Sequence, residues 1–266
     1  MTLYAENLTK NYGDTTALSE VSFKVPDGSF TVVLGESGAG KSTLLRILNG
    51  LTEPTSGSVY LDGEEIINSR SDVGMVFQQH NLVEELSAYG NALTGTLNRT
   101  GFFRSLINRQ SIEDRELALE ALETVGLLDE AGQKVSSMSG GQQQRVGIAR
   151  ALVQQPNLLL ADEPVASLDP SSAETVMEYL RETAKTRNLT TLASLHQVNI
   201  AREFGEQFIG IKNGEVVFIG PREKLTSEVL EEIYGYLETT DLREGTNTEE
   251  TSEQIQISDK SIGTEQ

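Results

Sequence analysis

The sequence predicts an α/β fold, and three observations lead to that prediction. Apolar runs of strand length alternate along the chain with segments in which apolar residues recur at helical spacing. One of these runs, Ser29 to Leu34, leads into a glycine-rich loop, and a helical pattern from Ser42 to Leu48 follows it. Hydrophobic residues make up 37% of the 266 residues, which is enough for a sizeable core.

The other expected strands come from short apolar runs and from turn dipeptides. Asp62-Gly63 and Asn213-Gly214 each separate two such runs, which is the pattern of a β-hairpin. We expect strands at Ser58–Leu61, Glu64–Ile66, Val73–Phe77, Leu158–Ala161, Thr190–Leu195, Phe208–Ile211 and Glu215–Ile219.

A stretch from about residue 79 to residue 155 has a different character and is interpreted as a helical insertion. Apolar residues there recur at intervals of three and four, and Pro156 is expected to end the second of two helices. The local structure of Gly101 to Arg109, which is aromatic and basic, is left open. The residues that carry the helical spacing are Ala118, Ala121, Leu122 and Val125 in the first helix, and Val146, Ala149 and Val153 in the second.

From about Thr239 the chain is polar, acidic and without aromatic residues. Such a segment cannot bury enough apolar surface to offset the entropy lost on ordering. The predicted organisation is therefore one domain over residues 1–238 and a disordered acidic tail over residues 239–266.

Composition excludes several classes of function. The chain has no cysteine and two histidines, His80 and His196, so disulfides, thiolate metal sites and histidine-rich metal sites are not expected. No run of about 18 apolar residues and no signal-peptide pattern is found, which predicts a cytoplasmic protein that reaches a membrane only through partners. A net charge of −19 argues against a basic face that binds nucleic acid.

The acidic excess is not confined to the tail. The tail carries seven acidic and two basic residues, so −14 of the −19 lies in the body, and arginine outnumbers lysine by 13 to 8. This composition favours a protein from a salt-loving organism, in which high internal salt screens a charged surface. An ordinary acidic cytosolic protein is the alternative.

The glycine-rich loop matches the phosphate-binding P-loop pattern in full, between a strand and a helix as that motif requires. Its glycines allow backbone N–H groups to wrap phosphates, and the helix N-terminus adds partial positive charge. Lys41 is expected to reach the β- and γ-phosphates, and Ser42 to bind Mg²⁺. The loop and its flank comprise Gly35, Glu36, Ser37, Gly38, Ala39, Gly40, Lys41, Ser42 and Thr43.

Further short motifs follow in a defined order, and each is weak alone. An apolar strand ends in two carboxylates, Asp162 and Glu163, and a second strand leads to His196. A Ser-Gly-Gly-Gln run opens a helix about twenty residues before the carboxylates. The remaining candidates are Tyr12, Gln78, Ser139, Gly140, Gly141, Gln142 and Asp169.

Taken together over about residues 1–237, these motifs resemble the ATPase subunits of ABC transporters. The resemblance implies a P-loop ATPase domain with a mixed β core, an antiparallel β subdomain and an inserted helical subdomain. Met138 stands where the family usually has leucine, and the similar volumes of the two side chains should preserve packing.

The same resemblance implies ATP and Mg²⁺ as cofactors and a role for each motif. Tyr12 would stack on adenine, while Ser42 and Gln78 would bind Mg²⁺ directly and Asp162 would hold it through water. Glu163 would act as general base toward water, which is the chemistry its position favours. His196 would contact the γ-phosphate and hold Glu163 in place.

The expected assembly also follows from the resemblance. Two copies would pair head to tail, so that the Ser139–Gln142 segment of one copy, with Asp169, closes the ATP site of the other. Two permease subunits would hold the pair at the cytoplasmic face of the membrane, and an external binding protein would supply the cargo.

Local stretches are most similar to the ATPases of phosphonate importers. These include the segment from Gln78 to Glu84, the segment from Ala161 to Pro170 and the ending Glu231 to Gly235. Asn199 departs from the aspartate usual in that group. An importer for phosphate, phosphite or another substrate remains an alternative, as do a soluble ABC protein acting on DNA or ribosomes and a nucleotide-binding scaffold without hydrolysis.

Overall fold

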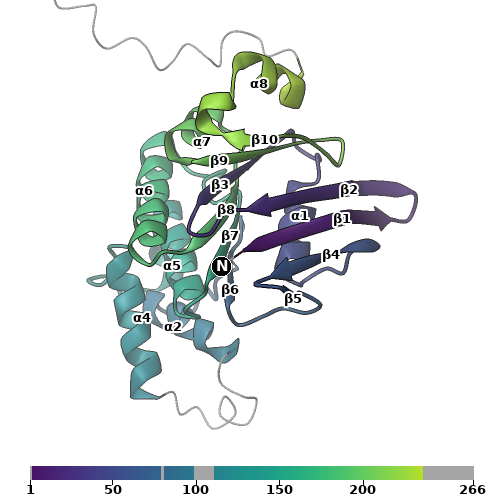
Figure 1. The fold of residues 1–266 in the computed structure, drawn as a ribbon. Coiled ribbons are helices and arrows are strands. Elements are labelled where there is room, and N and C mark those ends of the chain that lie inside the picture. Colours follow the sequence, from purple (N-terminus) through teal and green to yellow (C-terminus); the bar gives the residue numbers. More distant parts are fainter. Residues whose placement is uncertain (1, 79–80, 99–110, 236–266) are drawn as a thin grey trace, which may run out of the picture.

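The structure is a computed structural model that describes residues 2–78, 81–98 and 111–235. The predictions for His80, for the segment Gly101 to Arg109 and for the acidic tail fall outside these residues. Within them, the chain forms two sheets with helices packed on both sides of the larger one (Figure 1).

The larger sheet has six strands in the order β10-β9-β3-β8-β7-β6. All neighbouring pairs are parallel except β9 and β10, which form the hairpin predicted at Asn213-Gly214. Strands β3, β6, β7 and β8 are buried along their whole length, which explains why they read as unbroken apolar runs. The strands are β3 (Phe30–Leu34), β6 (Val73–Val76), β7 (Leu158–Asp162), β8 (Thr190–Ser194), β9 (Gln207–Lys212) and β10 (Glu215–Pro221).

The smaller sheet is antiparallel, in the order β2-β1-β4-β5. The Asp62-Gly63 turn joins β4 and β5 as predicted. Strands β1 and β2 were not assigned from the sequence, and bulges along their pairing interrupt the alternation of apolar and polar residues. The strands are β1 (Leu3–Tyr12), β2 (Thr15–Val25), β4 (Ser56–Leu61) and β5 (Glu64–Glu65).

The helices divide between the two faces of the larger sheet. Helix α1 lies between the two sheets, while α5, α6 and α7 cover the opposite face (Figure 1). The described helices are α1 (Lys41–Leu48), α2 (Ala88–Leu93), η1 (Thr94–Asn98), α4 (Ile112–Thr124), η2 (Val135–Ser137), α5 (Gly140–Leu152), α6 (Pro170–Thr186), α7 (Val198–Phe204), η3 (Arg222–Lys224) and α8 (Ser227–Tyr234).

The region predicted as a helical insertion contains α2, α4 and α5, which pack against one another. Met138, which stands where the family usually has leucine, is buried in this core. The predicted end of the second helix needs correction, because α5 ends at Leu152 rather than at Pro156. Gln155, directly before the proline, is left-handed with φ 52°, so the helical path stops before the proline is reached.

In the part of the chain that the structure describes, no helix combines the length and the apolar character needed to cross a bilayer.

Candidate functional site

The glycine-rich loop lies between the end of β3 and the start of α1. Gly38 and Gly40 have φ values of 82° and 108°, which side chains other than glycine rarely adopt. A Cβ atom at Gly40 would lie 2.5 Å from the carbonyl oxygen of Ala17, whereas one at Gly38 would meet no protein atom within 4 Å. One face of the loop therefore packs against β2, and the loop is open at Gly38.

Backbone hydrogen bonds from two other segments support this loop. The N–H group of Gly214, in the β9–β10 turn, donates to the carbonyl of Ala39 at 3.1 Å. The carbonyl of Gly214 accepts the N–H group of Ser19, on β2, at 2.9 Å. The shape of the loop thus depends on contacts far along the chain.

Lys41, the first residue of α1, is 4% exposed and points back under the loop. Its Nζ donates to the carbonyl oxygens of Gly35 and Glu36, at 2.8 and 2.9 Å. Burial lowers the pKa of Lys41, and the nearby carboxylates of Glu163 and Asp162 oppose that effect. The backbone carbonyls at the start of the loop therefore hold the buried ammonium group of Lys41.

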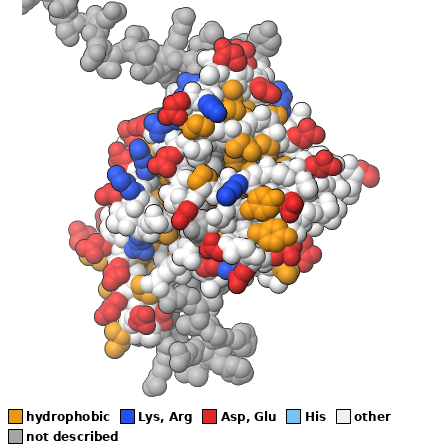
Figure 2. Space-filling model, in the orientation of Figure 1, with side chains coloured by type: hydrophobic (Ala, Val, Ile, Leu, Met, Phe, Trp, Pro, Cys, Tyr) orange, Lys and Arg blue, Asp and Glu red, His pale blue; other side chains and the backbone are white. Residues whose placement is uncertain are grey.

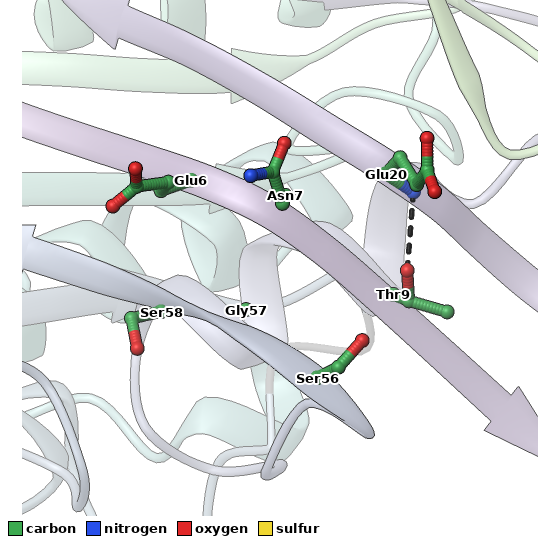
Figure 3. Close-up of a pocket in the computed structure, with 7 residues that line it drawn as sticks. All are labelled: Glu6, Asn7, Thr9, Glu20, Ser56, Gly57 and Ser58. Carbon is green, nitrogen blue, oxygen red and sulfur yellow. Dashed lines mark hydrogen bonds between the residues drawn. The ribbon is translucent and has the colours of Figure 1, made fainter.

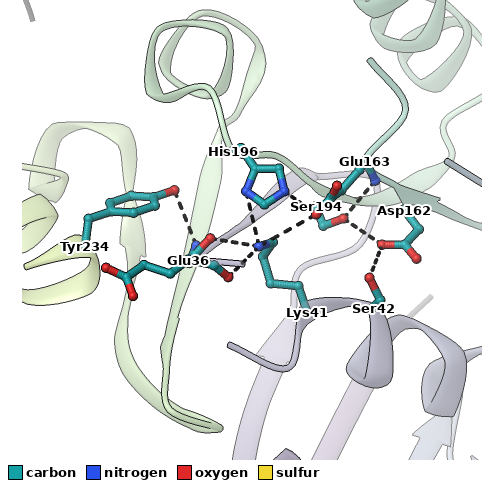
Figure 4. Close-up of polar contacts among 9 residues, drawn as sticks. Glu36, Lys41, Ser42, Asp162, Glu163, Ser194, His196 and Tyr234 are labelled. Carbon is teal, nitrogen blue, oxygen red and sulfur yellow. Dashed lines mark hydrogen bonds and ion pairs between the residues drawn. The ribbon is translucent and has the colours of Figure 1, made fainter. Parts of the chain in front are cut away.

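Glu163 and His196 meet this cation from the ends of neighbouring strands (Figure 4). Glu163 Oε1 lies 3.8 Å from Lys41 Nζ, and the Nε2 atom of His196 contacts the same carboxylate oxygen. The other ring nitrogen of His196, Nδ1, lies 3.4 Å from Lys41 Nζ. A histidine that donates a hydrogen bond from Nε2 can accept one from Lys41 at Nδ1. Each of the three side chains can therefore contact the other two.

Asp162 joins the site through hydroxyl groups. Its Oδ1 accepts hydrogen bonds from Ser42 Oγ at 2.8 Å and from Ser194 Oγ at 3.1 Å. Asp162 is buried at the end of β7, and Ser42 follows Lys41 on α1. The predicted order of motifs along the chain thus becomes a cluster in space.

The chemistry of these donors fits the predicted ligands. A hydroxyl group and a carboxylate are hard oxygen ligands of the kind that Mg²⁺ prefers. Within the described residues no group of three or more His, Cys, Asp or Glu side chains could hold a metal by itself. Ser42 and Asp162, which lie within hydrogen-bond distance of each other, would supply two such oxygen ligands.

Two predicted site residues stand apart from this cluster. Gln78, which follows β6, is exposed, and no hydrogen bond or ion pair of its side chain occurs within the described chain. Tyr12 is the last residue of β1 and is 50% exposed, with Lys10 Nζ 5.1 Å from its ring centroid. Both are accessible, and neither is among the polar partners of Lys41 or Glu163 in the described chain.

The remaining predicted residues lie at helix N-termini. Ser139 caps α5 in a capping box, in which its Oγ accepts the N–H group of Gln142 and Gln142 accepts the N–H group of Ser139. Asp169 caps α6 by accepting the N–H group of Ser172 at 3.0 Å, and that hydrogen bond lowers the pKa of Asp169. A Cβ atom at Gly141 would lie 3.2 Å from that of Ser172, so the two helix starts are neighbours.

Two residues of the site were not found from the sequence. The hydroxyl group of Ser194 is hydrogen-bonded to both Asp162 and Glu163 (Figure 4). The hydroxyl group of Tyr234, in α8, accepts the N–H group of Gly35 at 3.3 Å. The signal for Ser194 was a hydroxyl residue in an apolar strand two positions before His196. Tyr234 lies in the stretch Glu231 to Gly235 that was singled out by resemblance, but no role at the phosphate loop was predicted for it.

A separate hollow lies on the antiparallel sheet, between β1, β2 and β4 (Figure 3). Asn7, Glu20 and Gly57 line it in left-handed conformations, and Glu20 N–H donates to Thr9 Oγ1 at 3.1 Å. None of its lining residues belongs to the predicted site. It is a polar depression at the bulges of β1 and β2.

Comparison with known proteins agrees with this arrangement. The model of the family described as ABC transporter matches residues 18–166. The phosphonates import ATP-binding protein PhnC of Halobacterium salinarum is 64% identical over 239 residues, which cover 90% of this chain and 85% of that protein. A second relative of that description, from Haloquadratum walsbyi, is 61% identical over 241 residues, which cover 91% of this chain and 85% of that protein.

A solved structure extends the likeness to three dimensions. It is a dimeric ATP-binding cassette in a post-hydrolysis state, bound to ADP and Pi, with a TM-score of 0.72 and 35% identity. The match covers 83% of this chain and 98% of that one. The phosphate loop, the strand-end carboxylates and these similarities lead to one conclusion: the chain belongs to the ABC transporter family, as an ATP-binding cassette.

Proposed function

We propose that this chain hydrolyses ATP and thereby drives the import of a phosphonate or a related phosphorus oxyanion. The observation that carries the proposal is the meeting of Glu163 and His196 with Lys41, behind a complete phosphate loop. The names of the two relatives, both phosphonate import ATP-binding proteins, support the substrate class.

The nucleotide would be held by backbone and side chains together. Backbone N–H groups of the loop around Gly38 and of the start of α1 would face the phosphates, and Lys41 would exchange its two carbonyl contacts for phosphate oxygens. Tyr12 would stack on the adenine. Ser42, Gln78 and Asp162 would hold Mg²⁺, which supplies charge neutralisation on the phosphates.

Glu163 would polarise the attacking water as a general base. The contact with His196 fixes one carboxylate oxygen, and Lys41 lies on the same side, so the other oxygen is available to accept a proton. His196 is close enough to Lys41 to contact the γ-phosphate that the lysine would bind.

A second copy would complete the site head to tail. The solved relative is dimeric and holds ADP and Pi. Ser139, Gly140, Gly141 and Gln142 begin α5, whose N-terminus would face the phosphates of the partner's ATP. Asp169, beside them at the start of α6, would lie in the same interface.

Two permease subunits would anchor the dimer at the cytoplasmic face of the membrane, with residues 1–238 as the ATPase domain and residues 239–266 as a tail. Cargo would be chosen by the permease and by an external binding protein, since nothing in the described site is built to recognise it.

Substitution of Glu163 tests the hydrolysis. Glu163→Gln keeps the shape and the phosphate loop but removes the base, so phosphate release should fall at least about 100-fold while ATP still binds. Glu174→Gln, at an exposed position of α6, is the matched control. Phosphate release by Glu163→Gln equal to that of the control would reject Glu163 as the base.

Reconstitution with the cognate permease and binding protein tests the transport. ATP hydrolysis should rise with 2-aminoethylphosphonate and rise less with phosphate at equal concentration. Stimulation by sugars or amino acids alone would overturn the substrate class and leave the transport ATPase standing. Copurification with ribosomes or DNA and no permease would overturn the transport role as well.

A further inference from the structure

Ser194 is the last residue of β8 and is completely buried. In the parallel pairing of β7 with β8 it stands opposite Asp162. Ser194 therefore lies where both strands of the proposed site end, two residues before His196.

The hydroxyl group of Ser194 makes two hydrogen bonds, and both go to the paired acidic residues. It donates to Asp162 Oδ1 at 3.1 Å and accepts the backbone N–H group of Glu163 at 2.9 Å (Figure 4). A serine hydroxyl has a single proton, so donation to Asp162 leaves its lone pairs for Glu163. One buried oxygen thus holds two consecutive residues.

The second of these bonds bears on an unusual backbone conformation. Glu163 has φ 48°, in the left-handed region that residues with a Cβ rarely occupy. Such a conformation persists only where the surroundings hold it. The bond from Glu163 N–H to Ser194 is made at the residue that departs from the strand, so it helps to set the direction in which the Glu163 side chain leaves the sheet.

We propose that Ser194 is a positioning residue for ATP hydrolysis, which sets the backbone turn at Glu163 and at the same time orients the carboxylate of Asp162. The inference rests on the proposed function. In the described chain the hydroxyl group of Ser194 makes its hydrogen bonds to Asp162 and Glu163 and none to Lys41 or the phosphate loop, so we assign its effect to the two acidic residues.

Thr191 provides a matched control on the same strand. It is also completely buried, but its Oγ1 has no hydrogen-bond partner among the described residues. Thr191→Val removes a buried hydroxyl from β8 without breaking a hydrogen bond, whereas Ser194→Ala breaks two. A difference between these variants reports the hydrogen bonds rather than the loss of any hydroxyl from the strand.

The experiment measures phosphate release, ATP affinity and melting temperature of the full chain. We expect Ser194→Ala to lower kcat about 10- to 100-fold, the effect of a small misplacement of a catalytic group, with the KM for ATP changed less than about twofold. Ser194→Thr, which keeps the hydroxyl, should restore most of the loss, and Thr191→Val should match the unsubstituted chain.

A double substitution separates positioning from general destabilisation. Because part of the effect of Ser194 passes through the Glu163 carboxylate, adding Ser194→Ala to Glu163→Gln should lower the residual rate by clearly less than the factor that Ser194→Ala causes alone. A full multiplicative loss, or a Ser194→Ala rate equal to that of Thr191→Val, would overturn the inference. An unsubstituted chain that binds ATP without releasing phosphate would instead overturn the proposed function.

Discussion

Lys41 is a buried cation that has partners before any nucleotide is bound. Two backbone carbonyls, the carboxylate of Glu163 and the ring of His196 surround its ammonium group. A buried charge of this kind is tolerated only because each of its protons is directed at an acceptor. The site is thus organised around a charge that ATP would find already desolvated, and the lowered pKa of Lys41 reflects that burial.

Removal of this charge should act on binding. Lys41→Ala deletes the cation that would face the β- and γ-phosphates, and a hydrogen bond to a charged group is worth about 1.5–3 kcal/mol. ATP affinity should therefore fall by about tenfold or more, measured by titration with a fluorescent ATP analogue. Lys24→Ala, at an exposed position of β2, is the control, and equal affinities of the two variants would contradict the assignment.

The sequence predicted most of this cluster because its members sit in short motifs with a local signature. Lys41, Ser42, Asp162, Glu163 and His196 were all named, and the structure brings them together. Ser194 was missed because its role depends on the register of β7 against β8, which pairs residues that no local pattern connects.

Among the elements, α8 has the most direct link to the phosphate loop. Leu230 and Ile233 are completely buried, which seats the helix against β9 and β10. Tyr234, at its last turn, then accepts the N–H group of Gly35. Burial of the phenol raises the pKa of Tyr234 to about 12, so the group stays neutral at physiological pH.

This raised pKa predicts a loss of stability at alkaline pH. Below about pH 10 the phenol is protonated in both the folded and the unfolded chain, so it adds no pH dependence. Between about pH 10 and pH 12 the unfolded chain loses the proton first, so the free energy of unfolding falls as pH rises. Denaturant unfolding over this range should show a shallower fall for Tyr234→Phe.

Tyr234→Phe should also have a lower free energy of unfolding than the unsubstituted chain at neutral pH. Phenylalanine cannot accept the N–H group of Gly35, and the loss of one such hydrogen bond costs about 1 kcal/mol. Tyr60→Phe, at a residue that stacks on Tyr4 in the antiparallel sheet, is the control. Identical pH profiles for the two variants would show that the phenol of Tyr234 does not couple to stability.

Elements were predictable where burial gave them a simple pattern. The four buried parallel strands were found to within about one or two residues, because both of their faces need apolar side chains. Strands β1 and β2 were not assigned, since left-handed residues at Asn7 and Glu20 and the associated bulges break their alternation. Helices α6, α7 and α8 were not assigned individually either.

At the scale of the whole molecule, the six-stranded sheet separates two apolar cores. Leu159 of β7 faces the core under α5 and α6, while its neighbours Leu158 and Leu160 face the core under α1. The outer surface is acidic, and Figure 2 shows carboxylates spread over the face in view, with fewer basic side chains. Burial of apolar side chains in the two cores therefore stabilises the molecule, while repulsion among surface carboxylates opposes that stability.

Salt should stabilise a molecule of this kind. The screening length falls from about 30 Å at 0.01 M salt to about 3 Å at 1 M, which relieves repulsion among the acidic groups behind the net charge of −19. The melting temperature should rise steadily with KCl over this range. Sucrose at equal osmolality is the control, and a flat or falling response to KCl would contradict the halophilic interpretation that the relatives from Halobacterium and Haloquadratum support.

The β9–β10 turn has a consequence for the order of folding. Gly214 holds Ala39 of the phosphate loop and Ser19 of β2, three positions that lie far apart in the sequence. Contacts of such long range form slowly, because much of the chain must be ordered before they close. A nascent chain that ends before Gly214 would have every residue of the glycine-rich loop and still lack the support that shapes it. Nucleotide affinity should thus be acquired late in synthesis, which would keep incomplete chains from sequestering ATP.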